Sequence, residues 1–272
     1  MSTISKERAE SPIGHVLTRG FYSLASQLVI PTSIVHEGMQ NGISGAERAK
    51  TLLKMGVGLI IIYTHPSRTD THRLMGLWRN HEYAVPSCLI PIASHQMNVA
   101  ARISALPTGV EFHGIVTKET VARRQNKGHK EGYGSTKFLE IAIQRLSAGG
   151  IVLLAPSATR TPVLTMPEGL LTPTDVLLNA AQRKSIPFAV MSTGFEINGV
   201  TSYQDASGFN LFRRYTLNTG YTFTDSEILE RLEAFRTEKG LLFNPKRPFN
   251  DTDQWLFETQ LPSLVPPAYR PA

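Results

Sequence analysis

Short apolar runs alternate with amphipathic stretches along the chain from residue 32 onward. The apolar runs are rich in Val, Ile, Leu and Phe, which is typical of strands buried inside a sheet. They read TSIVHE, GLIIIYT, CLIPIAS, VEFHGIV, IVLLA and PFAVMS. Because strands alternate with helix-like segments, the pattern predicts an α/β fold with a mostly parallel central sheet flanked by helices.

Residue types that cap helix N-termini open four of the amphipathic stretches: Ser44, Ser135, Thr172 and Thr224. Glu47 and Glu227 stand three residues after the first and the last of these, which is the spacing of a capping box. Pro173 suits the first position of a helix. A further helix is expected from about Thr69 to Arg79. These signals place a helix after most of the predicted strands.

Two other segments carry turn signals. Asn198-Gly199 and Asn218-Thr-Gly220 are typical of hairpin turns, because Asn and Gly tolerate the left-handed backbone conformation that such turns need. The last predicted helix ends at Gly240. The tail after it is rich in proline and is expected to be irregular.

The first 31 residues form a separate predicted segment. Apolar residues recur there at helical spacing: Ile13, Leu17, Phe21, Leu24 and Leu28. Pro31 ends this stretch, so the pattern predicts an N-terminal amphipathic helix. We favour a helix that packs on the core, and a helix that rests on a membrane surface is the alternative. We therefore divide the chain into a helical segment, 1–31, and an α/β domain, 32–272.

The charge composition indicates the kind of partner the protein binds but does not identify one. The formal net charge is +6 and the pI is about 9.5, so anionic partners are expected. No basic stripe with interleaved aromatics and no zinc-finger spacing is present, so nucleic acid is not expected. The one cysteine, Cys88, excludes an intrachain disulfide and lies in an apolar run, which predicts a core position.

The length of the apolar runs bears on location. The longest, Gly58–Tyr63, is far shorter than the ~20 residues that a membrane-spanning helix needs. The N-terminus also lacks the apolar centre of a signal peptide. We expect a cytoplasmic protein that is in solution or peripheral on a membrane.

The segment LIIIYTHPSRTD carries the clearest candidate chemistry. A buried strand would deliver His65 at its carboxyl end, where ligands bind in open α/β sheets. Asp70 would lie in the first turn of the next helix, where the helix dipole stabilises an anion. A carboxylate bonded to one imidazole nitrogen leaves the other free to act as a general base. The spacing alone is equally compatible with an Asp70 that only caps the helix beside an unrelated His65.

This segment also resembles the first motif of the glycerol-3-phosphate and 1-acylglycerol-3-phosphate acyltransferase family, in which His and Asp are separated by four residues. Ser67 occupies the usual serine position, and Thr64 stands where many members have Asn. The later segment IVLLAPSATRTP resembles the third motif, a strand that leads to Pro-Glu-Gly-Thr-Arg-Ser. Ser157 replaces the Glu of most members, and Ala-Pro-Ser followed by Arg160 is similar to the soluble chloroplast branch of the family.

Two weaker matches complete the family order. IPFAVMS resembles the fourth motif, Val-Pro-Ile-Val-Pro-Val, with Ala189 in place of the second proline. GVEFHGIVTKETVARR resembles the second motif, in which a strand is followed by a basic residue. Here Lys118 comes first, before Arg123 and Arg124. The resemblance covers about residues 32–195.

The resemblance implies transfer of a fatty acyl group from acyl-CoA or an acyl carrier protein to a hydroxyl of glycerol-3-phosphate or lysophosphatidate. His65 and Asp70 would be the catalytic pair. It implies phosphate binding by four basic residues: Arg160, Lys118, Arg123 and Arg124. Four further residues would support the motifs: Ser67, Pro156, Ser157 and Thr159. No cofactor or metal is expected, and no His-Glu-x-x-His occurs.

Other interpretations remain open. The acceptor could be an amine, a sugar or another alcohol, because the motifs define the His–Asp pair more firmly than the acceptor. The chain could also be a non-catalytic lipid-binding or carrier-binding relative. Arg160 could be a surface residue after a turn, and Lys118–Lys130 could be a solvated basic loop or a reversible contact with an anionic membrane.

Overall fold

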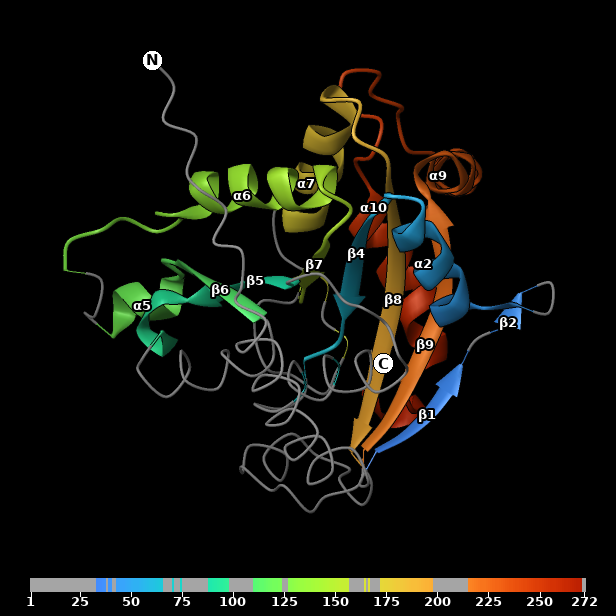
Figure 1. Cartoon of the computed structure of the whole chain (residues 1–272), viewed down its shortest axis with the longest axis horizontal. Coiled ribbons are helices and arrows are strands. Elements are labelled where there is room, and N and C mark those ends of the chain that lie inside the picture. Colours follow the sequence, from blue (N-terminus) through green and yellow to red (C-terminus); the bar gives the residue numbers. More distant parts are fainter. Residues whose placement is uncertain are drawn as a thin grey trace.

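The computed structural model has a sheet with helices on both faces, which confirms the α/β prediction (Figure 1). The residues that the structure describes are 33–37, 39–40, 43–65, 70, 74, 88–97, 110–123, 127–156, 164, 166, 172–197 and 215–270. The segment 1–31 and its amphipathic helix lie outside the described residues, so this helix and the domain boundary stay predictions.

Seven strands form the main sheet in the order β1-β9-β8-β4-β7-β5-β6. In chain order they are β1 (Ser33–Glu37), β4 (Gly58–Tyr63), β5 (Cys88–Ala93), β6 (Val110–Ile115), β7 (Ile151–Leu154), β8 (Phe188–Ile197) and β9 (Tyr215–Thr224). The strands from β4 to β8 are mutually parallel, whereas β9 runs antiparallel to β8 and parallel to β1. A small ribbon of β2 (Met39–Gln40) and β3 (Ile43–Ser44) lies apart.

The central strand β4 is buried along its whole length, as its unbroken apolar sequence predicts. Alternate residues enter two cores: Leu59 and Ile61 on one face, Ile60 and Ile62 on the other. Full burial of one such side chain contributes ~1.5–3 kcal/mol. Cys88 of β5 is fully buried in the first core, as predicted.

Helices cover both faces of the sheet. α2 (Gly45–Lys54) packs on the first core through Ala49. The second core is covered by α6 (Ser135–Ser147), α7 (Pro173–Arg183) and α9 (Asp225–Lys239). Shorter helices follow two strand ends, namely η2 (Ser94–Gln96) after β5 and α5 (Lys118–Ala122) after β6. Because these strands are parallel, their carboxyl ends lie at one edge of the sheet, and a helix or loop follows each of them there.

Most of the predicted helix caps are confirmed. The Ser44 hydroxyl accepts from the Glu47 amide at 3.1 Å, and Thr172 accepts from the Asp175 amide at 3.3 Å. The capping box of Thr224 is also present. The prediction that Ser135 caps α6 is wrong, because Gly134 holds that position with φ +85°. A Cβ at Gly134 would lie 2.7 Å from a backbone oxygen, so only glycine fits there.

The prediction of a turn at Asn218–Gly220 is wrong. These residues lie inside β9, where Gly220 allows two neighbours to approach the strand closely. The Gly220 carbonyl oxygen is 1.9 Å from where a Cβ of Gly45 would be, so the backbones of α2 and β9 approach closely there. The Thr222 hydroxyl also donates to the Gly45 carbonyl at 2.6 Å. Glycine marks a close approach here, not a turn. Asn198-Gly199 lies outside the described residues.

The prediction of an irregular tail is correct for residues 241–251 and wrong for the residues after them. After α9 the chain forms α10 (Thr252–Trp255), a π-helical turn η4 (Leu256–Gln260), α11 (Leu261–Leu264) and η5 (Pro267–Tyr269). The red turns of this tail lie behind β8 and β9 in Figure 1, and α11 contacts both strands. Its helices are short and begin at Thr, Leu and Pro residues, so they lack the long apolar period that identifies helices in a sequence.

Candidate functional site

His65 stands at the carboxyl end of β4, two residues after the last strand residue. Its Nδ1 lies 3.3 Å from Oδ2 of Asp70, at the long end of the range for a hydrogen bond. The Asp70 side chain is fully buried, whereas His65 is 20% exposed. A buried carboxylate therefore faces an imidazole that solvent or a ligand can reach.

Thr64 ties the start of this turn to β8. Its amide donates to the Thr193 carbonyl at 3.1 Å, and its hydroxyl accepts from the Phe195 amide at 2.9 Å. The side chain thus adds one more rung to the β4–β8 ladder after the strand ends. The sequence analysis considered Thr64 only as a departure from Asn and did not predict this anchoring role. The feature that could have indicated the role is a β-branched residue with a hydroxyl group directly after a buried strand.

The arrangement suits proton transfer. With Nδ1–H donated to Asp70, Nε2 of His65 carries the lone pair and can accept a proton from a bound hydroxyl. Among the residues that the structure describes, Asp70 is the only hydrogen-bond partner of His65. The Tyr63 ring packs edge-on against the imidazole, with 5.8 Å between ring centroids.

The predicted third-motif residues follow β7, which lies directly beside β4. Pro156 is buried at the end of that strand. Ser157, Thr159 and Arg160 lie outside the described residues, as do Ser67 and Arg124, so their roles stay predictions. The parallel pairing of β4 with β7 does bring the two chain segments to the same edge of the sheet.

Lys118 and Arg123 lie elsewhere on this edge. They belong to α5 and its end, which follow β6, three strand spacings or roughly 14 Å across the sheet from β4. β5 pairs with β7 only at Cys88 and Leu89, so the β5–β6 pair diverges further from β4. Arg123 forms an exposed ion pair with Glu119. The structure does not bring these two basic residues to His65.

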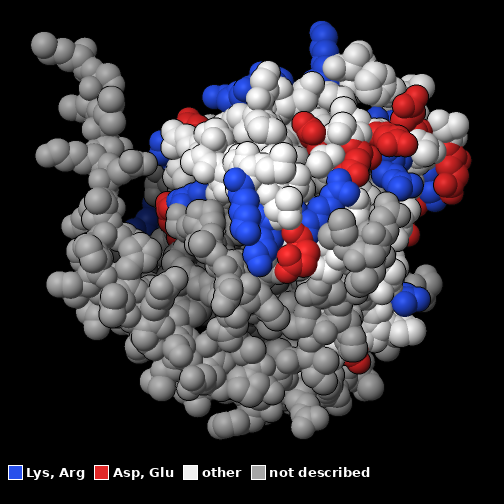
Figure 2. All heavy atoms as spheres, turned by 45° about the vertical axis from the view of Figure 1, so that its right-hand side comes forward, with Lys and Arg blue, Asp and Glu red and all other residues white. Residues whose placement is uncertain are grey.

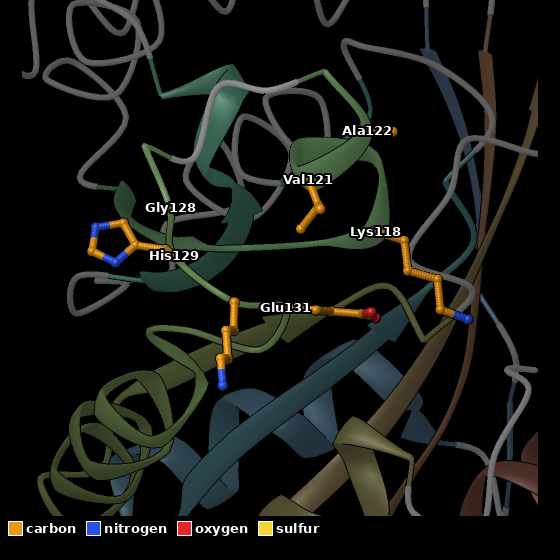
Figure 3. Close-up of a pocket in the computed structure, with 7 residues that line it drawn as sticks. Lys118, Val121, Ala122, Gly128, His129 and Glu131 are labelled. Carbon is orange, nitrogen blue, oxygen red and sulfur yellow. The ribbon is translucent and has the colours of Figure 1, made fainter.

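A surface hollow of about 580 Å³ lies beside Lys118, between α5 and residues 128–131 (Figure 3). Val121 and Ala122 form part of its wall. Lys118 and His129 point in opposite directions in Figure 3, so these two side chains do not converge on one point. Lys118 and Lys130 line the hollow together with the acidic Glu131, so it lacks the geometry of a tight phosphate site.

Charges of both signs are mixed on the face that Figure 2 shows. Arg48 pairs with Glu227 at 2.7 Å, and Lys239 pairs with Glu258 at 2.6 Å. Within the described part of the chain, no three His, Cys, Asp or Glu side chains gather as metal ligands would. A second polar cluster at the carboxyl edge joins the buried His95 to the Thr120 hydroxyl at 2.8 Å. The His65–Asp70 pair differs from it because its imidazole is partly exposed and its partner is a carboxylate.

Fold and site together define an α/β protein with a histidine–aspartate pair at the carboxyl end of its central strand. Neither a comparison with models of protein families nor a comparison with curated proteins finds a match to this chain.

Proposed function

We propose that this protein is an acyltransferase that moves a fatty acyl group from acyl-CoA or an acyl carrier protein to a hydroxyl of glycerol-3-phosphate or lysophosphatidate. One observation carries the proposal. His65 Nδ1 lies 3.3 Å from a fully buried Asp70 carboxylate, at the strand end where α/β proteins bind ligands. The four motif resemblances supply the reaction class.

The chemistry needs a general base, because a glycerol hydroxyl is a weak nucleophile at neutral pH whereas a thioester is a good electrophile. Nε2 of His65 takes the hydroxyl proton while the oxygen attacks the thioester carbonyl. Asp70 stabilises the imidazolium that forms. Collapse of the tetrahedral intermediate breaks the C–S bond, and the proton on His65 passes to the departing thiolate. The sequence has no Gly-x-Ser-x-Gly elbow, so direct transfer is favoured over a covalent acyl-enzyme.

The distance of each basic residue from His65 decides which of them can bind the acceptor phosphate. The phosphate of glycerol-3-phosphate lies five bonds from its free end hydroxyl, roughly 6 Å. Lys118 and Arg123 lie on the far side of two strands from His65, so the acceptor phosphate is assigned to Arg160, which follows the neighbouring strand β7. A guanidinium binds phosphate through two parallel hydrogen bonds. Lys118, Arg123 and Arg124 are left for an anionic group further away, such as a phosphate of the donor.

The test is a screen of acyl-CoA and acyl-carrier donors against glycerol-3-phosphate, lysophosphatidate, sugars and amines. Replacing His65 by Ala should lower transfer by ~10²–10⁴-fold while circular dichroism shows a folded protein. Added imidazole should restore part of the rate in His65→Ala. Asp70→Asn, the matched variant that keeps the imidazole, should show no such rescue.

Several outcomes would contradict the proposal. Near-normal turnover by a folded His65→Ala protein excludes His65 as the base. Donors that bind without being consumed by any acceptor favour the non-catalytic binding relative. Transfer to an amine or sugar, with none to the glycerol acceptors, would keep the mechanism and replace the acceptor.

A further inference from the structure

The C-terminal tail packs behind β8 and β9 (Figure 1) and reaches the part of β8 that lies beside the carboxyl end of β4. We call residues Leu261–Tyr269 the C-terminal strap. Six residues form a small apolar core around it: Leu164, Phe257, Leu261, Leu264, Val265 and Tyr269. This core is separate from the two that flank the sheet. Pro262, Pro266 and Pro267 restrict the backbone of the strap, which lowers the entropy lost on docking.

One end of the strap is seated on β8 and β9 through Leu264. A Cβ at Gly194 of β8 would lie 2.2 Å from the Leu264 carbonyl oxygen, so the strap touches bare backbone there. The Asn218 side chain of β9 donates to that same oxygen at 2.8 Å. Gly194 and Asn218 are cross-strand partners. Leu264 is therefore held by both members of one β8–β9 pair.

The contact between Leu264 and Gly194 lies next to the hydrogen bonds that hold Thr64. Gly194 lies between Thr193 and Phe195, and both of these residues hydrogen-bond Thr64. Thr64 immediately precedes His65. The strap is thus connected to the imidazole through Gly194, its chain neighbours Thr193 and Phe195, and the hydrogen bonds of these two residues to Thr64.

The other end of the strap holds the segment that follows β7. The Leu164 amide donates to the Tyr269 carbonyl at 2.8 Å, and the Leu164 side chain is buried in the strap's core. β7 and β8 are the two neighbours of β4 in the sheet. The strap therefore joins the continuations of both strands that flank the one carrying His65.

We propose that Leu264 and Asn218 are positioning residues for His65: the strap fixes the end of β8, and β8 fixes Thr64 and the imidazole. General-base catalysis depends on such placement, since a misplacement of ~1 Å can cost up to ~10²-fold in rate. The kinetic part of this inference rests on the proposed acyl transfer, whereas its structural part does not.

Asn218→Asp is the sharpest variant, because it keeps the shape of the side chain and replaces the donor to the Leu264 carbonyl by an acceptor. Asn244→Asp is the matched control, at an exposed asparagine outside the strap. A chain that ends at Val265 serves as a second variant if Asn218→Asp does not fold. Amide hydrogen exchange of Thr64, Leu164 and Phe195, and NMR signals of the His65 imidazole, report placement without any activity.

We expect Asn218→Asp to speed exchange of the Phe195 amide at least ~10-fold and to shift the His65 signals. The kcat for transfer should fall ~10–100-fold with the donor KM unchanged, while Asn244→Asp behaves as the unaltered protein. Unchanged His65 signals in both strap variants would overturn the inference. So would faster exchange at Leu164 with normal kcat. If no donor is consumed by the unaltered protein, the proposed function fails and the His65 signals alone decide the inference.

Discussion

At the residue scale, the three residues Thr64, His65 and Asp70 show what spacing can predict. The four-residue gap predicted that the carboxylate could return to the imidazole, and the 3.3 Å contact is consistent with it. Spacing could not predict the role of Thr64, because its hydroxyl bonds to a residue 131 positions later in the chain. Anchors of this kind depend on which strand becomes the neighbour.

Thr64→Val tests this anchor. Valine keeps the shape but removes the acceptor, so the buried Phe195 amide loses its partner. An unsatisfied buried donor costs ~1–3 kcal/mol, and we expect a loss of that size in the free energy of unfolding, measured with urea. Thr64→Ser keeps the hydroxyl and should lose much less. Equal losses in the two variants would mean that the methyl group, not the hydrogen bond, matters at this position.

At the element scale, two helices hold each other by their first turns. Asp175 of α7 accepts from the amides of Thr252 and Asp253 at 3.1 and 3.3 Å, in the first turn of α10. Asp253 in turn faces Thr172 and Thr174, which open α7. Burial, with the charge of Asp253 as the second cause, raises the pKa of Asp175 to about 7. Burial raises the pKa of Asp253 to about 6.

The sign of the pH dependence follows from these shifts. Both carboxyls have a higher pKa in the folded state than the ordinary value of 3.8, so they bind protons more tightly when the protein is folded. Protonation at low pH therefore favours the folded state. That contribution is lost as the pH rises from about 4 through 7. Arg236 of α9 forms an ion pair at 2.9 Å with Asp251, the residue before α10, and so ties the start of α10 to α9.

We expect Asp175→Asn to flatten the fall in unfolding free energy between pH 5 and pH 8. The amide oxygen can still accept from α10, and no charge develops beside Asp253. The difference in unfolding free energy between the variant and the unaltered protein should shift in favour of the variant by ~1–3 kcal/mol from pH 5 to pH 8. One pKa unit corresponds to ~1.4 kcal/mol. Asp225→Asn, in the first turn of α9, is the control. Parallel pH profiles for Asp175→Asn and the unaltered protein would refute the shift.

At the scale of the whole molecule, the protein combines a net charge of +6 with a face on which charges of both signs are mixed. No helix in the described ranges is long and apolar enough to cross a bilayer. Two segments remain as proposed membrane contacts, the stretch Ile13–Leu28 and the basic region Lys118–Lys130. Exposed Val121 and Tyr133 lie within or beside the second of these.

Sedimentation with anionic liposomes tests this contact. A peripheral contact through basic side chains should bind at low salt and release at high salt, because the ions screen the attraction. Neutral liposomes are the control and should bind weakly at both salt concentrations. Binding that survives high salt and needs detergent for release would show a deeper insertion of the N-terminal segment.

The sequence by itself determined the buried strands, most helix starts and the order of elements, because apolar periodicity and caps act over a few residues. β4 and the caps at Ser44, Thr172 and Thr224 are examples. Only the tertiary structure decided that Asn218–Gly220 lies within a strand, that the tail is helical from Thr252 onward, and that Lys118 is far from His65. These depend on contacts between residues far apart in the chain and on the divergence of β5 and β6 from β4 within the sheet. Local propensity contains no information about long-range contacts or strand divergence, since the same glycine or proline can form a turn or lie where another backbone segment packs closely.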